Sequence, residues 1–193
     1  MIALIIGDGY LRPDSQLAIE HSAKQFEYVL YKKELVEKIL GCVPINLRKR
    51  SRLDKRTNKI YTGYSFVKGH RYFHILRRFI YPNNKKTLSK AVLNFLTPQG
   101  LAIWYMDDGF LNYKLASLAT YCSEEEADII INFFKEKFDL DIRKYWHKGN
   151  SAYYHAFDVP SSNKFFDLIY EFIIPSMKYK IPCSYIPRVL DNI

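Results

Sequence analysis

Cysteine is scarce in this chain, and long apolar runs are absent. The three cysteines, Cys42, Cys122 and Cys183, are far apart and odd in number, so neither a disulfide framework nor a cysteine-based zinc site is expected. A reducing compartment is therefore the default. No segment approaches the roughly 20 apolar residues needed to cross a bilayer, and the apolar run Ile2–Ile6 is too short for a secretory signal. We expect no membrane partner.

Glycine, proline and acidic residues are also few. With 8 Gly and 8 Pro, the chain has no Gly/Ser-rich linker or low-complexity stretch, which favours two subdomains packed together. Lys and Arg total 29 against 20 Asp and Glu, and this net charge of +9 favours a polyanionic partner without establishing one. Apolar residues make up 48%, enough for a substantial core. Heavy use of Lys, Ile, Tyr, Phe and Asn is typical of AT-rich coding sequences, so a mitochondrion, a chloroplast and a bacterial interior all stay open as the compartment.

One pattern occurs twice along the chain. An apolar stretch ending in an acidic-glycine pair runs from Ile2 to Gly9 and recurs from Leu101 to Gly109. Asp8 and Asp108 therefore each open one half of the chain, and a repeat of this kind is sought before individual elements are assigned. The repeat predicts two related subdomains, residues 1–97 and 98–193.

The segment after each aspartate follows the same order. In the first half, residues 16–21 alternate like a strand and residues 23–40 have helical periodicity ending at Gly41. In the second half, residues 110–120 are expected to be extended. Ser123 is expected to cap a helix whose acidic first turn favours the positive helix end.

A hairpin and a second helix are predicted next in each half. The hairpins are expected at residues 44–50 with 59–67, and at residues 141–147 with 153–159. The helices are expected near residues 70–81 and 162–174, each ending at a proline that precedes a lysine-bearing loop. Each half is thus predicted to run α-β-β-α-β-β-α.

The two acidic-glycine segments resemble the LAGLIDADG motif. The chain is similar to single-chain, two-motif, intron-encoded homing endonucleases of this family in Trp104–Gly109, in Asn83–Thr87 and in Tyr179–Pro182. The resemblance implies an α+β fold: two pseudo-twofold-related αββαββα subdomains whose antiparallel sheets form a DNA-binding saddle. It further implies a monomer that makes double-strand cuts, leaving 3′ overhangs, in DNA with a long asymmetric target site.

The paired aspartates also make chemical sense. Phosphodiester hydrolysis needs a polarised phosphoryl group, an activated water and charge relief on the leaving oxygen, all of which divalent metals supply. Carboxylates are hard ligands suited to Mg²⁺ (or Mn²⁺). In the family the motif aspartates bind the metals, a role carried here to Asp8 and Asp108. The backbone carbonyls of Gly7 and Asp107 are candidate additional ligands, and the Asp107 side chain is expected to be structural.

Two lysines complete the predicted catalytic set. Lys86 and Lys180 match the family's active-site lysines, which organise the hydrolytic water or stabilise developing negative charge. Lys85 and Lys178 are the alternatives if the alignment is shifted by one or two residues.

The hairpins are expected to read DNA, because β-ribbons reach base edges in the major groove. Arg48, Arg50 and Arg52 alternate, which places them on one strand face if the strand extends that far. Arginines are expected on guanine edges and phosphates, and lysines mainly on phosphates. The predicted DNA-binding residues are Arg48, Lys49, Arg50, Arg52, Lys55, Arg56, Lys59, Arg143, Tyr145, His147 and Lys148.

An intron-RNA maturase or splicing cofactor on the same fold is the alternative, with intron RNA as its partner. Such proteins can keep a basic surface while losing nuclease chemistry, and the presence of both aspartates and both lysines favours the enzyme. Because the first motif starts at Met1, we expect either a short first helix or a reading frame that begins earlier.

Overall fold

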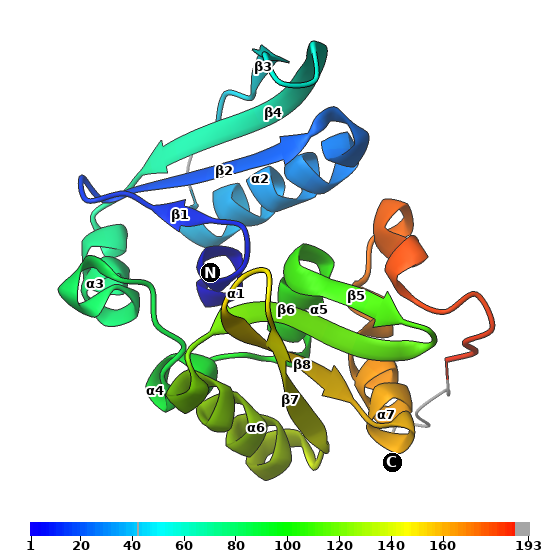
Figure 1. The fold of residues 1–193 in the computed structure, drawn as a ribbon. Helices are drawn as coiled ribbons and strands as arrows, with labels where there is room; N and C mark the ends of the chain where they lie inside the picture. The colour runs from blue at the N-terminus through cyan, green and yellow to red at the C-terminus, as the bar shows by residue number, and fades with distance from the viewer. Residues whose placement is uncertain (42, 188–193) are drawn as a thin grey trace. The chain divides into compact units, whose positions relative to one another are not determined.

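The computed structural model describes residues 1–41 and 43–187, and it divides into two compact units, Met1–Lys85 and Lys86–Ile193. Each unit contains one four-stranded antiparallel sheet (Figure 1). Cys42 lies outside the described residues, while Cys122 and Cys183 are free thiols. Among the described residues, no helix is both long and apolar enough to span a bilayer. The subdomain division at residues 97 and 98, which follows the motif repeat, remains a proposal.

The first unit has the predicted order of helices and strands. Its sheet order is β1-β2-β4-β3, and α2 covers one face of that sheet (Figure 1). Its elements are α1 (Ile2–Ile6), β1 (Tyr10–Leu11), β2 (Gln16–Ser22), the 3-10 helix η1 (Ala23–Gln25), α2 (Phe26–Leu40), β3 (Arg48–Asp54), β4 (Lys59–Gly69), α3 (Tyr72–Ile80) and the 3-10 helix η2 (Pro82–Asn84).

The second unit repeats this order. Its sheet order is β5-β6-β8-β7, and helices α6 and α7 pack on it (Figure 1). Its elements are α4 (Lys90–Leu93), α5 (Pro98–Asp108), β5 (Gly109–Asn112), β6 (Leu115–Cys122), α6 (Glu124–Phe138), β7 (Ile142–His147), β8 (Ala152–Phe157), α7 (Val159–Ile169) and the 3-10 helices η3 (Tyr170–Phe172) and η4 (Pro175–Lys180).

Buried and more exposed side chains alternate along β2, so the two faces of the first sheet differ. Along β2, Leu17, Ile19 and His21 are buried, while the intervening side chains are exposed or half-buried. Helix α2 packs on this strand and ends at Gly41, whose φ of 55° is the left-handed conformation that glycine adopts without strain. The alternation therefore leaves the face opposite α2 open to a partner.

The predicted start of α6 is confirmed in detail. The Ser123 hydroxyl accepts a hydrogen bond from the Glu126 backbone N–H, and the Glu126 carboxylate accepts one from the Ser123 N–H. This reciprocal capping box satisfies two backbone donors that the helix leaves unpaired. The apolar face then buries Phe134 against Phe157 and Phe165, with ring centroids 5.1 and 6.1 Å away.

The bounds of the first strand in the first hairpin were predicted wrongly. Its first strand was expected at residues 44–50, but β3 spans Arg48–Asp54. Residues 44–47 are excluded from the sheet because Pro44 has no N–H to donate and the Ile45 N–H donates to the Glu37 carboxylate on α2. Asp54 still pairs with Lys59. The strand therefore extends far enough to include Arg52.

Two further boundaries also differ from prediction. The segment 110–120 is two strands, because Tyr113 turns the chain with a φ of 57° between β5 and β6. Helix α7 begins at Val159 rather than Ser162, because the Asp158 side chain caps it by accepting from the Ser161 N–H. The helix ends at Ile169 and continues only as the 3-10 turn η3.

A buried histidine makes the second unit sensitive to acid. His155 is 0% exposed, and its Nε2 lies 3.1 Å from the carbonyl oxygen of Ala127. A carbonyl only accepts, so Nε2 carries the proton of a neutral ring. Burial lowers the pKa of His155 to about 4.

We expect the free energy of unfolding to fall by about 2 kcal/mol between pH 7 and pH 5 because of His155. The pKa is lower in the folded state than the unfolded value of about 6.5, so the unfolded chain binds the proton first as pH falls. This stabilisation is complete above pH ~6.5 and is lost by about pH 4. Urea unfolding of the wild type and of His155→Gln at both pH values measures it, and equal pH dependence in the two proteins would contradict it.

Candidate active site and DNA-binding faces

The first motif ends in a tight reversal of the chain after a short helix. Helix α1 ends at Ile6, and the Gly9 N–H donates to the Leu4 carbonyl at 3.0 Å. A Cβ at Gly9 would overlap that carbonyl oxygen, so only glycine permits the approach. Asp8 thus lies two residues beyond the end of the helix, with a side chain 44% exposed.

The second motif also depends on a glycine after its aspartate, here directly at the end of a longer helix. Helix α5 includes Asp108, and the Gly109 N–H donates to the Tyr105 carbonyl. A Cβ at Gly109 would overlap the backbone and ring of Tyr105. The indole Nε1 of Trp104, one turn earlier, donates to Asp108 Oδ2 at 3.0 Å. Each motif aspartate therefore precedes a glycine that lies too close to the preceding helix to carry a Cβ, although Asp8 lies beyond its helix and Asp108 is the last residue of its own.

Lys180 is tied to the last turn of α5. Its Nζ donates to the carbonyl oxygens of Met106 and Asp107 at 2.6 and 3.0 Å. The Tyr105 hydroxyl in turn donates to the Lys180 carbonyl at 2.9 Å, and burial raises the pKa of Tyr105. An ammonium group at a helix C-terminus is favoured by the helix dipole. The second unit therefore places the Lys180 ammonium against the backbone of Asp107, next to Asp108 in the chain.

Lys86 follows the 3-10 helix η2 and is half-buried. Asn83 and Asn84 before it have φ values of 54° and 61°, a left-handed conformation that asparagine tolerates. The two alternative lysines differ, because Lys85 and Lys178 are exposed whereas Lys86 and Lys180 are half-buried. This difference in burial favours the predicted alignment of Lys86 and Lys180.

The open face of the first sheet carries a row of arginines. Arg48, Arg50 and Arg52 lie opposite Ser65, Gly63 and Tyr61 of β4, and opposite residues share a face. A cleft of about 220 Å³ on this unit is lined by Asp8, Glu20, Arg48 and Arg50 among others. The arginine row predicted from the sequence is therefore continuous with the first motif aspartate.

The open face of the second sheet is aromatic. Arg143, Tyr145 and His147 alternate on β7, whereas the intervening Lys144 turns to α6 and pairs with Asp128 at 2.8 Å. Tyr145 stacks on Tyr154 of β8, with ring centroids 5.5 Å apart.

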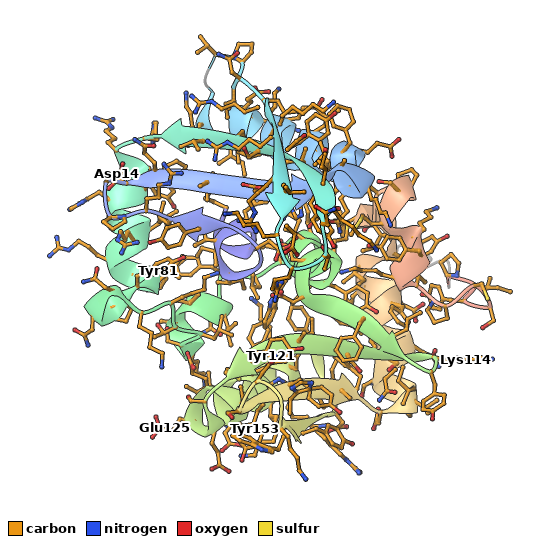
Figure 2. The ribbon with its side chains drawn as sticks, turned by 45° about the horizontal axis from the view of Figure 1, so that its top comes forward. Asp14, Tyr81, Lys114, Tyr121, Glu125 and Tyr153 are labelled. Atoms are coloured by element: carbon orange, nitrogen blue, oxygen red, sulfur yellow. The ribbon has the colours of Figure 1, made fainter. Side chains whose placement is uncertain are left out.

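A hollow of about 360 Å³ lies on the same unit. Figure 2 shows one of its residues, Tyr121, on β6, and Lys114 at the turn between β5 and β6. Its lining residues are Phe110, Asn112, Tyr121, His147 and Tyr154.

All eleven predicted DNA-binding residues are exposed. Lys55 and Arg56 lie in the β3–β4 turn, where Arg56 Nε is 3.5 Å from Asp54, and Lys148 lies in the β7–β8 turn. Their exposure leaves these side chains accessible to a polyanion.

Sequence reasoning missed one polar pair beside Asp8. His21 on β2 has its Nδ1 3.7 Å from Asp8 Oδ2, and its Nε2 lies 2.9 Å from the Nζ of the fully buried Lys32. The available signal was a lysine on the buried face of α2, beside Tyr28, Val29 and Val36. A charged residue at an apolar helical position is rare unless it is paired.

Comparison with known proteins agrees with this arrangement. A family model described as the LAGLIDADG DNA endonuclease family matches residues 1–165. The chain is 27% identical over 195 residues to the probable intron-encoded endonuclease 1 of Wickerhamomyces canadensis, covering 94% of this chain and 81% of that protein. It is also 28% identical over 202 residues to the protein RecA of Mycolicibacterium flavescens, covering 94% of this chain but only 45% of that protein.

Two solved structures share the fold. The homing endonuclease I-WcaI bound to its DNA recognition sequence matches with a TM-score of 0.78 and 24% identity, covering 97% of this chain and 84% of that one. I-DmoI in complex with DNA and Ca matches with a TM-score of 0.52 and 9% identity, covering 87% and 85%.

The two four-stranded antiparallel sheets are the fold that this chain shares with these solved homing endonucleases. This chain belongs to the LAGLIDADG DNA endonuclease family.

Proposed function

We propose that this chain is a sequence-specific, intron-homing endonuclease that hydrolyses both strands of a DNA duplex with divalent metal ions, Mg²⁺ or Mn²⁺. The observation that carries the proposal is that each unit places an aspartate directly before a glycine whose close approach to a helix excludes a Cβ: Asp8 before Gly9 and Asp108 before Gly109. Membership of a DNA endonuclease family supports the assignment of one metal-binding aspartate to the cleavage of each strand.

The donor atoms at the end of each motif fit a hard divalent cation. Asp8 presents a partly exposed carboxylate in the cleft that Glu20 also lines, and Asp108 is half-buried. The Gly7 and Asp107 carbonyls would add oxygen ligands, since a carbonyl that accepts from Lys180 keeps a second lone pair. Mg²⁺ takes few protein oxygens and keeps several waters. A related fold in complex with DNA and Ca supports divalent metal use.

When bound, the metals would polarise the scissile phosphate and lower the pKa of a water. The chain's own groups supply position and charge around that reaction. Asp8 and Asp108 orient the reacting centre, and Trp104 holds one oxygen of Asp108. Lys180, fixed on the end of α5, and Lys86 present ammonium groups that stabilise developing negative charge.

The two open sheet faces supply DNA contacts of different chemistry. The arginine row of β3 suits phosphates and guanine edges, where guanidinium groups form bidentate hydrogen bonds. The aromatic face of the second sheet suits apolar contact with base edges, including thymine methyl groups. Because the faces differ, we propose a long asymmetric target bound by a monomer.

The test is cleavage of DNA that contains the flanking sequence of a native insertion site, with Mg²⁺ and with EDTA. Site-specific double-strand cuts that require the metal are expected. Tight binding of the same DNA without cutting, or preferential binding of intron RNA, would overturn the proposal in favour of a maturase or splicing cofactor. Sedimentation of the DNA complex reports whether one chain is bound.

A further inference from the structure

A fully buried lysine lies behind the first motif aspartate. Of the lysines and arginines in the described part of the chain, Lys32 alone is buried, at 0% exposure. Its Nζ lies 2.9 Å from His21 Nε2 and 4.4 Å from the centroid of the Tyr28 ring. His21 is 5% exposed, and its other ring nitrogen, Nδ1, is 3.7 Å from Asp8 Oδ2. Lys32 on α2, His21 on β2 and Asp8 in the first motif are thus connected by successive polar contacts.

The chemistry of lysine determines the tautomer of the histidine. An ammonium group only donates, so His21 Nε2 is the acceptor in the bond with Lys32. The proton of the neutral ring therefore lies on Nδ1, the nitrogen that faces the Asp8 carboxylate. A protonated Nδ1 has no lone pair for a metal ion. His21 is accordingly placed to orient Asp8 rather than to bind the metal itself.

We propose that Lys32 and His21 are positioning residues for Asp8: Lys32 holds His21 in its Nδ1–H tautomer, and His21 holds the Asp8 carboxylate in its metal-binding orientation. The proposal rests on the proposed function, in which Asp8 serves one strand cut. At 3.7 Å the contact between His21 and Asp8 is electrostatic rather than a hydrogen bond. Removing an outer polar group that orients a metal ligand lowers metal affinity or activity by about 10- to 100-fold.

The second unit positions its aspartate differently. Asp108 accepts from Trp104 Nε1, an uncharged donor four residues earlier on the same helix. The other buried histidine, His155, contacts Thr120 and the Ala127 carbonyl instead of an aspartate. Loss of Lys32 should therefore impair one strand cut, whereas loss of the Trp104 donor should impair the other.

The stability of the Lys32 variant is measured beside its activity. Replacing a whole buried polar pair by apolar groups is often neutral or stabilising, whereas removing one partner alone leaves the other unsatisfied and costs stability. Lys32→Met retains an unbranched side chain and leaves the His21 Nε2 without this donor, so the variant is expected to fold with reduced stability. Urea unfolding is expected to show that the variant is folded under the assay conditions, and a loss of activity there is informative about Asp8.

The first experiment follows each strand of the target separately with two fluorescent end labels. Lys32→Met is expected to slow one strand about 10- to 100-fold relative to the other and to accumulate nicked DNA. Trp104→Phe is expected to give the opposite strand bias. His21→Asn, whose amide nitrogen can replace Nδ1, is expected to retain more activity than His21→Gln. Equal slowing of both strands by Lys32→Met would overturn the proposal.

The second experiment needs neither metal nor DNA. Nitrogen-15 NMR of the histidine rings, with His21 assigned from its Asn variant, is expected to show the Nδ1–H tautomer in the wild type. Lys32→Met is expected to remove this preference, while His155→Gln, a control for loss of a buried imidazole, leaves it intact. A Nε2–H tautomer in the wild type would overturn the proposal.

The two proposals fail separately. If the wild type cuts no DNA in the presence of metal, the proposed function fails whatever the tautomer of His21. If the wild type cuts but Lys32→Met shows no strand bias, the positioning role fails and the endonuclease assignment stands.

Discussion

Asp8→Asn and Asp108→Asn are each expected to reduce double-strand cleavage by about 1,000-fold or more. A metal-bound carboxylate supports several kcal/mol of transition-state stabilisation, and each 1.36 kcal/mol corresponds to a factor of ten. Asparagine keeps the size of the side chain but loses its negative charge. Single-turnover cleavage in saturating Mg²⁺ measures the effect, and DNA affinity in Ca²⁺ is expected to change far less than the rate.

A neighbouring acidic residue provides the matched control. Asp107→Asn changes the same charge at the end of α5, but the contact with Lys180 uses the Asp107 backbone carbonyl, which the substitution retains. We expect Asp107→Asn to reduce cleavage much less than Asp108→Asn. The reverse order would transfer the metal-binding role to Asp107 and contradict the proposed site.

Replacing Arg48, Arg50 and Arg52 together by alanine is expected to weaken target binding at least about 100-fold, since one arginine contact to DNA is worth about 1–3 kcal/mol. If all three contact phosphates, the slope of log affinity against log salt falls by roughly 3. Fluorescence anisotropy at several salt concentrations measures both quantities. The three side chains share the open face of β3, so their loss should leave the core intact.

A second triple variant controls for net charge. Lys24, Lys38 and Arg78 are exposed on η1, α2 and α3, and their replacement by alanine removes the same three charges. Binding is expected to change little, because contact with the phosphate backbone rather than total charge determines counterion release. Equal losses in the two triple variants would show that the β3 face has no special role.

The order of elements was predictable because each element has its own period. Helices α2 and α6 show a 3.6-residue apolar pattern, and Gly41 and Ser123 give clear stop and start signals. The bounds of strand β1 were not predicted, and β5 was merged with β6 into one segment. With two and four residues, these strands are too short to show alternation. Resemblance to a known motif then assigned candidate roles to Asp8 and Asp108 that periodicity alone does not provide.

The parts of the site that escaped prediction depend on contacts distant in sequence. Lys180 binds carbonyl groups of α5 more than 70 residues earlier, and no local pattern encodes that contact. His21 and Lys32 meet only because β2 and α2 pack together. From the sequence, His21 is one of five histidines and Lys32 one of many lysines. Their importance becomes visible only when burial and distance are known.

The close approach of Gly9 and Gly109 to the preceding helices limits which residues of this motif can change during evolution. Because no side chain fits at Gly9 or Gly109, these positions must remain glycine, and the backbone conformation there fixes the position of the preceding aspartate. The apolar positions before each aspartate vary more: Ala3 and Leu4 in the first motif correspond to Ile103 and Trp104 in the second. The two halves can therefore differ widely in their core residues and in their DNA-binding sheet faces while each keeps its motif aspartate in the same position before its glycine. A gene duplicated once can in this way acquire two unlike half-sites without rebuilding its chemistry.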